Sequence, residues 1–154
     1  MRIEISKRPD GRGVLQCVRA DGSKTWQRQD RDSAFFALHD LTHFAVESVL
    51  GYRYGFFGLL ASGWNIDETD GKSLRGPLPA EALEVESIVG LLDRERACGA
   101  IWCAADFETG RQAASRPLSD EDLAHVRKTR DELFKRWAEV QPGSALTLEF
   151  SQVK

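Results

Sequence analysis

Alternating apolar and polar residues predict strands at both ends of the chain. The segment "RIEISK" alternates in the way that is typical of a half-buried strand. The segments "VLQCVRA" and "KTWQRQ" flank "DGS", which predicts a β-hairpin with Asp21 and Gly22 at its turn. "ALTLEFSQV" alternates strictly and places its leucines and Phe150 on one face. We therefore expect this last segment to be a strand that returns to pair with the first ones.

Apolar residues at helical spacing predict three long helices between these strands. The first spans 33–50, with Asp32 or Ser33 as its N-cap and Gly51 as its C-terminal stop. The second begins near the proline of "LPAEALEVESIVGLLDRE", because proline suits a first helical turn. The third, "SDEDLAHVRKTRDELFKRWAEV", begins with a capping box at Ser119 and ends before "QPG".

Strands segregated from helices predict an α+β fold. We expect a small antiparallel sheet, made of the N-terminal strands plus the C-terminal strand, packed against three or four helices. The chain has 154 residues, which favours a single domain over 1–154. Its most apolar window, "YGFFGLLASGW", is shorter than the roughly 20 residues of a membrane span, so it predicts a buried short helix or a turn-rich core segment and no membrane partner.

Charge and cysteine content narrow the classes of protein further. The net charge is −3, and basic residues are scattered among acidic ones, as in "DRERA". A nucleic-acid-binding protein would need a clustered basic surface, so no nucleic-acid partner is expected. The cysteines number 3, and an odd count cannot pair completely within one chain. We interpret them as reduced thiols in the core of a cytoplasmic protein.

The segment "FFALHDLTHFAVESVLG" carries an unusual polar set on an apolar helix. On a helical wheel His39 falls within the apolar arc and His43 at its edge, while Asp40 and Glu47 lie just beyond it. The four residues form a continuous strip along the border of the predicted buried face. His39 is expected to lie deeper than His43, so its loss should cost more stability.

Two histidines one helical turn apart have the spacing that holds one divalent metal such as zinc. "HDLTH" loosely resembles the HExxH motif of zinc metallopeptidases, although Asp40 is one methylene shorter than the glutamate of that motif. This reading assigns His39 and His43 as metal ligands and Asp40 and Glu47 as catalytic residues, acting as base or as orienting groups in a hydrolase-like site. The candidates for a third ligand lie in the next loop: Asp67, Glu68 and Asp70.

A non-catalytic reading stays open beside the metal site. The same residues would then form a buried hydrogen-bond network in an interaction or oligomerisation module. In the latter case, copies of the chain would assemble into a homo-oligomer. His125 is expected on the solvent side of its helix, too far round to join a site. Arg130 falls inside the apolar stripe of that helix and needs a carboxylate partner, for which Glu47, Asp40 and Glu149 are candidates.

The segment "HDLTHFAVESVLGYRYGFFGLLASGW" resembles the signature of a group of small bacterial proteins. These proteins carry an HDLxHFxVE helix followed by a glycine-rich apolar run, and the resemblance covers about a sixth of the chain. It implies a bacterial cytosolic origin. No activity is known for that group, so the resemblance implies none for this chain.

Overall fold

Four strands form one antiparallel sheet in the order β3-β2-β1-β4. The computed structural model describes residues 1–31 and 33–151, without the side chain of Ser33. Its strands are β1 (Arg2–Lys7), β2 (Gly13–Val18), β3 (Lys24–Gln29) and β4 (Ala145–Glu149). The hairpin of β2 and β3 turns at Asp21 and Gly22, where Gly22 takes the positive φ of 83° that glycine adopts readily. The predicted return of the last strand to the first is confirmed.

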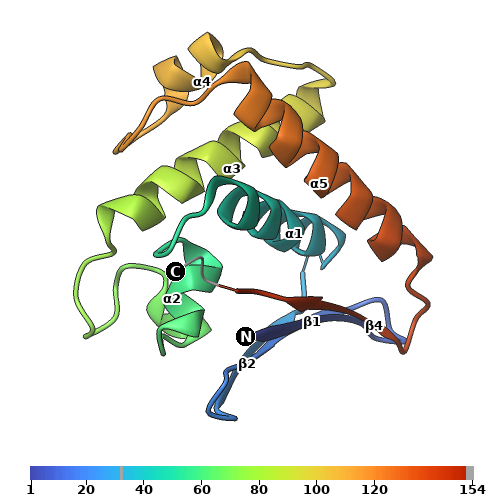
Figure 1. Cartoon of the computed structure of the whole chain (residues 1–154). Coiled ribbons are helices and arrows are strands. Elements are labelled where there is room, and N and C mark those ends of the chain that lie inside the picture. The colour runs from blue at the N-terminus through green and yellow to red at the C-terminus, as the bar shows by residue number, and fades with distance from the viewer. Residues whose placement is uncertain (32, 152–154) are drawn as a thin grey trace.

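The helices pack in layers, with the long ones on one face of this sheet and the first short one beside it (Figure 1). They are α1 (Ser33–Leu50), α2 (Phe56–Ala61), α3 (Ala80–Cys98), α4 (Ala104–Gly110) and α5 (Asp120–Glu139), with a short 3-10 helix η1 (Ile66–Glu68). Helix α1 lies between the sheet and the pair α3 and α5, and it contacts both of those helices, α2 and β2. The predicted α+β fold is confirmed, and its core lies around α1.

Local signals set the ends of these helices as expected. Ser119 Oγ accepts a hydrogen bond from the Asp122 N–H at 3.0 Å, and Asp122 Oδ2 accepts one from the Ser119 N–H at 3.0 Å, which completes the capping box of α5. Gly51 follows α1 with a φ of 73° and ends it. The predicted N-cap of α1 at Asp32 or Ser33 lies outside the described residues and side chains.

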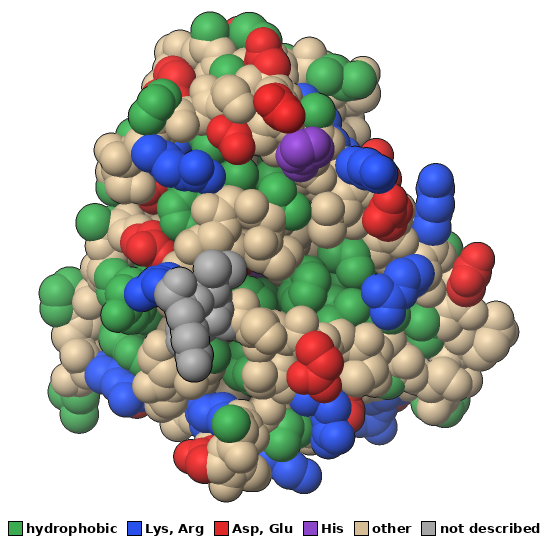
Figure 2. Space-filling view, viewed as in Figure 1, with side chains coloured by type: hydrophobic (Ala, Val, Ile, Leu, Met, Phe, Trp, Pro, Cys, Tyr) green, Lys and Arg blue, Asp and Glu red, His purple; other side chains and the backbone are tan. Residues whose placement is uncertain are grey.

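The apolar residues of the alternating segments lie on the inward face of the sheet. Ile3, Ile5, Leu146, Leu148 and Phe150 are all buried. The apolar window after α1 contains the short buried helix α2, as predicted. Among the described residues, no helix is long and apolar enough to cross a membrane. Basic and acidic side chains are interspersed over the face shown in Figure 2, which has no continuous basic patch.

The three cysteines carry free thiols, but they do not share one environment. Cys17 is buried in the sheet, and burial raises the pKa of its thiol to about 12. Cys98 and Cys103 are exposed near the end of α3 and the start of α4, so the prediction that all three are core residues is wrong for these two. Their segment consists of the end of α3 and the start of the short helix α4.

Candidate functional site

The four polar residues predicted on the 33–50 helix lie on α1, the helix enclosed by the others. Asp40, His43 and Glu47 are buried, with exposed fractions of 6%, 2% and 1%. The side chain of His39 is 25% exposed. The prediction that His39 lies deeper than His43 is therefore wrong, and so is the placement of Asp40 and Glu47 beyond the buried border.

The helical wheel failed because it used apolar side chains to locate the buried side of α1. Phe35 and Phe36, which helped to define the apolar arc, are 44% and 41% exposed. Helix α1 instead packs against α5, α3 and the sheet, so most of its circumference is covered. Three of the four polar residues are buried as a consequence, and buried polar groups must find partners inside the protein.

Glu47 finds its partners at the start of α2. Its Oε1 accepts a hydrogen bond from the Phe57 N–H at 3.1 Å, and its Oε2 accepts one from the Gly58 N–H at 2.9 Å. The first amides of a helix have no partner within the helix, and the positive end of its dipole favours a carboxylate. A Cβ on Gly55 would lie 2.5 Å from Glu47 Cδ, so this close approach requires glycine at that position.

His43 lies between two carboxylates. Its Nδ1 is 3.4 Å from Glu47 Oε1, and its Nε2 is 3.4 Å from Glu86 Oε1, which belongs to α3. Burial disfavours the charged imidazolium, but the two carboxylates outweigh burial and raise the pKa of His43 to about 10. For Glu86, burial works against ionisation, and the attraction of His43 overcomes it and holds the pKa of this carboxyl below its usual value.

His39 is oriented by a carboxylate of α3. Its Nδ1 lies 2.7 Å from Asp93 Oδ2, within hydrogen-bond distance. When Nδ1–H donates to a carboxylate, the lone pair of the ring is on Nε2, which is the arrangement found behind metal-binding histidines. The ring of His39 meets that of His43 edge to face, with 4.8 Å between the ring centroids. The two imidazoles are therefore neighbours with different hydrogen-bond partners.

His39, His43 and Glu86 together form a group that could hold a metal ion. One ligand atom from each lies within 4.8 Å of the ligand atoms of the other two. Tetrahedral zinc ligands at about 2.1 Å from the ion lie about 3.4 Å apart, so closing the group requires a small side-chain shift. The side chain of Glu86 is 50% exposed and has room to make it.

This group forms part of the wall of a pocket of about 220 Å³. Asp40 lines the same pocket and accepts a hydrogen bond from Gln29 Nε2 at 2.6 Å. Burial raises the pKa of Asp40 to about 6, against the opposing attraction of His43. Phe36, Phe56 and Ile66 supply apolar wall, and Thr69 and Asp70 supply polar wall. The pocket therefore places a carboxylate of raised pKa beside the two histidines.

Sequence reasoning missed the two α3 carboxylates of the site. It sought the third ligand among Asp67, Glu68 and Asp70, of which Asp70 lines the pocket and Glu68 is paired with Arg75 at 2.8 Å. Glu86 and Asp93 stand two helical turns apart and therefore on one face of α3. Acidic residues on one face of the otherwise apolar "EVESIVGLLD" were the available signal.

The arginine predicted to pair with Glu47, Asp40 or Glu149 makes a different contact. Arg130 pairs with its neighbour Asp131 at 3.0 Å and lies over the ring of Phe134. The arginine of α5 that does bind a buried carboxylate is Arg127, which is 2.6 Å from Glu95 of α3. His125 is exposed on α5, as expected. Arg130 therefore takes no part in the site.

Comparison with known proteins gives no further guide to this site: no family model, curated protein or solved structure matches the chain.

Burial reverses the expected ranking of the two histidine variants. His43→Ala should lower the free energy of unfolding by about 2–4 kcal/mol, because it empties a buried site and leaves Glu47 without its charged partner. His39→Ala should cost less, since part of that side chain is already in water. Urea midpoints of the two variants test this, with the exposed His125→Ala as a control expected within about 0.5 kcal/mol of the parent protein. A larger loss for His39→Ala would contradict the burial described here.

Proposed function

We propose that this domain binds a divalent metal such as zinc through His39, His43 and Glu86 and uses it in a hydrolytic reaction. One observation carries the proposal: the three ligand atoms lie within 4.8 Å of one another at the wall of a pocket. The contact between His39 and Asp93 supports it, because a carboxylate behind the ring fixes the tautomer that leaves Nε2 available. Three protein ligands with a position open to the pocket are typical of catalytic rather than structural zinc sites.

The residues around the group have distinct roles in this proposal. A bound ion would supply Lewis acidity for a polarised carbonyl or phosphoryl oxygen. Asp40, with its pKa of about 6, is ionised at neutral pH and accepts a proton from water in the pocket. Glu47 is committed to two amides of α2 and serves as a positioning residue behind His43, not as the base.

The same contacts support a second candidate, a structural network in a non-catalytic interaction module or homo-oligomer. Each imidazole has carboxylate neighbours without any metal: Asp93 for His39, and Glu47 and Glu86 for His43. An imidazolium flanked by two carboxylates at 3.4 Å is electrostatically favourable in its own right. The two candidates differ in one measurable property, which is the stoichiometric retention of a metal.

The setting proposed for either candidate is the cytoplasm of a bacterium. The free thiols of the three cysteines support a reducing compartment. The bacterial source rests on the HDLxHFxVE resemblance of α1 and the segment after it.

Metal content decides between the two candidates. The parent protein loaded with zinc and dialysed should retain about one ion per chain, and His39→Ala, His43→Ala and Glu86→Ala should each retain far less. His125→Ala is the matched control and should retain the ion, because His125 is exposed on α5. Elemental analysis of the four variants makes the measurement. Zinc retention by the His43→Ala variant would refute the ligand assignment. A parent protein that retains no zinc would favour the second candidate, the structural network.

Zinc affinity should also depend steeply on pH. The pKa of His43 is raised to about 10 in the metal-free protein, so a proton occupies this ligand at neutral pH and zinc must displace it. Affinity should rise roughly tenfold per pH unit between about pH 7 and about pH 9, since one proton is released per ion. Competition with a chelator of known affinity measures the slope. A slope near zero over this range would contradict zinc binding through His43.

A further inference from the structure

A groove runs along the edge of the sheet beside the pocket. A hollow of about 330 Å³ lies along the junction of β3 and the turn around η1, and four consecutive residues of β3, Lys24 to Gln27, line it. Successive side chains of a strand point to opposite faces of a sheet. A hollow that touches four residues in a row therefore borders the edge of the strand and not one face. β3 stands at one end of the strand order, which agrees with this placement.

The main chain of Trp26 faces this groove. The Arg19 N–H donates to the Ser23 carbonyl at 2.9 Å, which makes this the hydrogen-bonded pair at the end of the β2–β3 ladder. Hydrogen-bonded and non-hydrogen-bonded pairs alternate along an antiparallel ladder. In the observed register Thr25 and Gln27 therefore direct their main-chain groups toward β2, and Trp26 directs its own outward.

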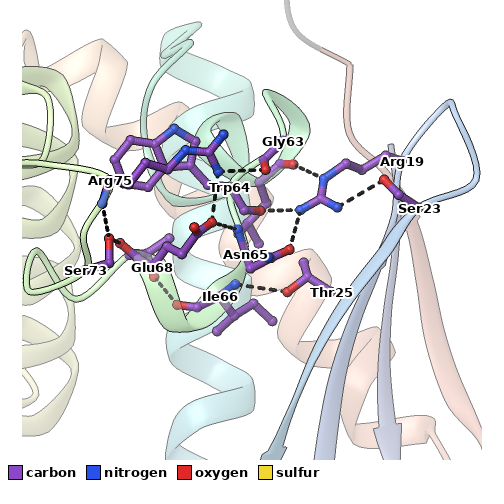
Figure 3. A network of polar contacts seen from close by, with 12 residues as sticks. Arg19, Ser23, Thr25, Gly63, Trp64, Asn65, Ile66, Glu68, Ser73 and Arg75 are labelled. Atoms are coloured by element: carbon purple, nitrogen blue, oxygen red, sulfur yellow. Dashed lines mark hydrogen bonds and ion pairs between the residues drawn. The ribbon is translucent and has the colours of Figure 1, made fainter.

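The far wall of the groove is tied to the hairpin. The Ile66 N–H donates to Thr25 Oγ1 at 2.9 Å, and Arg19 Nη2 donates to Asn65 Oδ1 at 3.2 Å and to the Trp64 carbonyl. Figure 3 shows Arg19 reaching from the strands to this turn. Contacts from two elements hold the walls in place, so a ligand would not have to order them on binding.

The groove lies next to the pocket of the candidate metal group. Gln27 and Ile66 line both hollows, so the two are adjacent at these residues. The four strand residues span about 13 Å at about 3.3 Å per residue. A ligand that follows β3 for this length would enter the pocket lined by His39, His43 and Glu86.

We propose that this groove binds an extended polypeptide segment, which adds to the edge of β3 and leads into the pocket of His39, His43 and Glu86. A strand edge presents alternating N–H and C=O groups, and the main chain of another extended peptide matches that pattern. The walls are mostly polar, with Lys24, Asn65 and Asp67 among them, and suit main-chain amides better than an aliphatic chain. The peptide's role as substrate rests on the function proposed above; its binding to the groove does not.

The binding test uses a probe without a chosen sequence. Isotope-labelled protein is titrated with an equimolar mixture of random hexapeptides, acetylated and amidated so that terminal charges play no part. The amide signals of residues 24–28 and 65–67 should shift. A mixture of single acetylated amino-acid amides at the same residue concentration should leave them in place. Equal shifts from the single residues would overturn the proposal, since they would reveal a side-chain site, and so would an absence of shifts at 24–28 with the hexapeptides.

A matched pair of variants separates the contribution of the Trp26 main chain to peptide binding from that of its side chain. Trp26→Pro removes the outward N–H without removing a bond to β2, a position at which an edge strand accepts proline. Trp26→Val removes the indole alone. Hexapeptide affinity should fall by about tenfold or more in the proline variant and much less in the valine variant. The reverse order would overturn the proposal.

Two further measurements keep the outcome unambiguous. If Trp26→Pro fails to fold, hexapeptides methylated on alternate main-chain nitrogens replace it, and these should bind the parent protein about tenfold more weakly. Unchanged affinity would overturn the proposal. The zinc-free His39→Ala variant should still bind the unmodified hexapeptides. If the hexapeptides bind but the parent protein retains no zinc, the metal site is refuted and the groove is not. If the parent protein retains zinc but binds no hexapeptide, the groove is refuted and the metal site is not.

Discussion

Replacement of Glu47 by alanine is expected to lower the free energy of unfolding by about 3–5 kcal/mol, the range found when a buried charged network loses one partner. The change removes the acceptor of the buried Phe57 N–H, at about 1–3 kcal/mol, together with the hydrogen bond from the Gly58 N–H. It also removes one of the two carboxylates that lie 3.4 Å from the ring nitrogens of His43. Urea denaturation followed by circular dichroism measures the loss.

Two control variants show whether loss of the Glu47 carboxylate itself causes the loss of stability. Glu47→Gln keeps one oxygen acceptor for the amides of α2 and should lose clearly less stability than Glu47→Ala. Glu132→Ala removes an exposed glutamate of α5 and should change stability by no more than about 0.5 kcal/mol. If Glu47→Ala unfolds at the urea concentration of the parent protein, the capping of α2 by Glu47 does not hold.

Deletion of the chain from Ala145 onward should abolish cooperative folding. The deletion removes β4, whose Leu146 and Leu148 lie opposite Ile5 and Ile3 of β1 and are buried. Burial of each such side chain contributes about 1.5–3 kcal/mol, so the loss approaches the 5–15 kcal/mol that stabilises a typical domain. Calorimetry should show no sharp thermal transition, whereas a sharp one would mean that the remaining strands suffice.

Two substitutions on the same strand test the cause without shortening the chain. Leu148→Asp places a carboxylate on the buried face of β4 and should unfold the protein or nearly so. Thr147→Asp places the same carboxylate on the exposed face, opposite Glu4 of β1, and should cost no more than about 1 kcal/mol. Similar losses from both would show that β4 is sensitive along its whole length and not on one face.

The sequence by itself determined the elements whose signals are local. The two-residue alternation of "ALTLEF" requires a strand with one buried face, and Gly22 supplies the positive φ of the hairpin turn. Ser119 and the acid three residues later set the start of α5 through contacts within one turn. The pairing of His39 with His43 was also visible, because residues four apart on a helix are neighbours whatever surrounds them.

Only the tertiary structure decided how deep those residues lie and what meets them. The depth of His39 and His43 depends on how α3, α5 and the sheet cover α1, which no pattern within α1 records. Glu86 and Asp93 reach the histidines because α3 packs across α1, and β3 borders a groove because the turn around η1 is tied to the hairpin. The packing of the whole chain decides which individual side chains meet between segments far apart in sequence, and a local periodicity carries no information about those side-chain contacts.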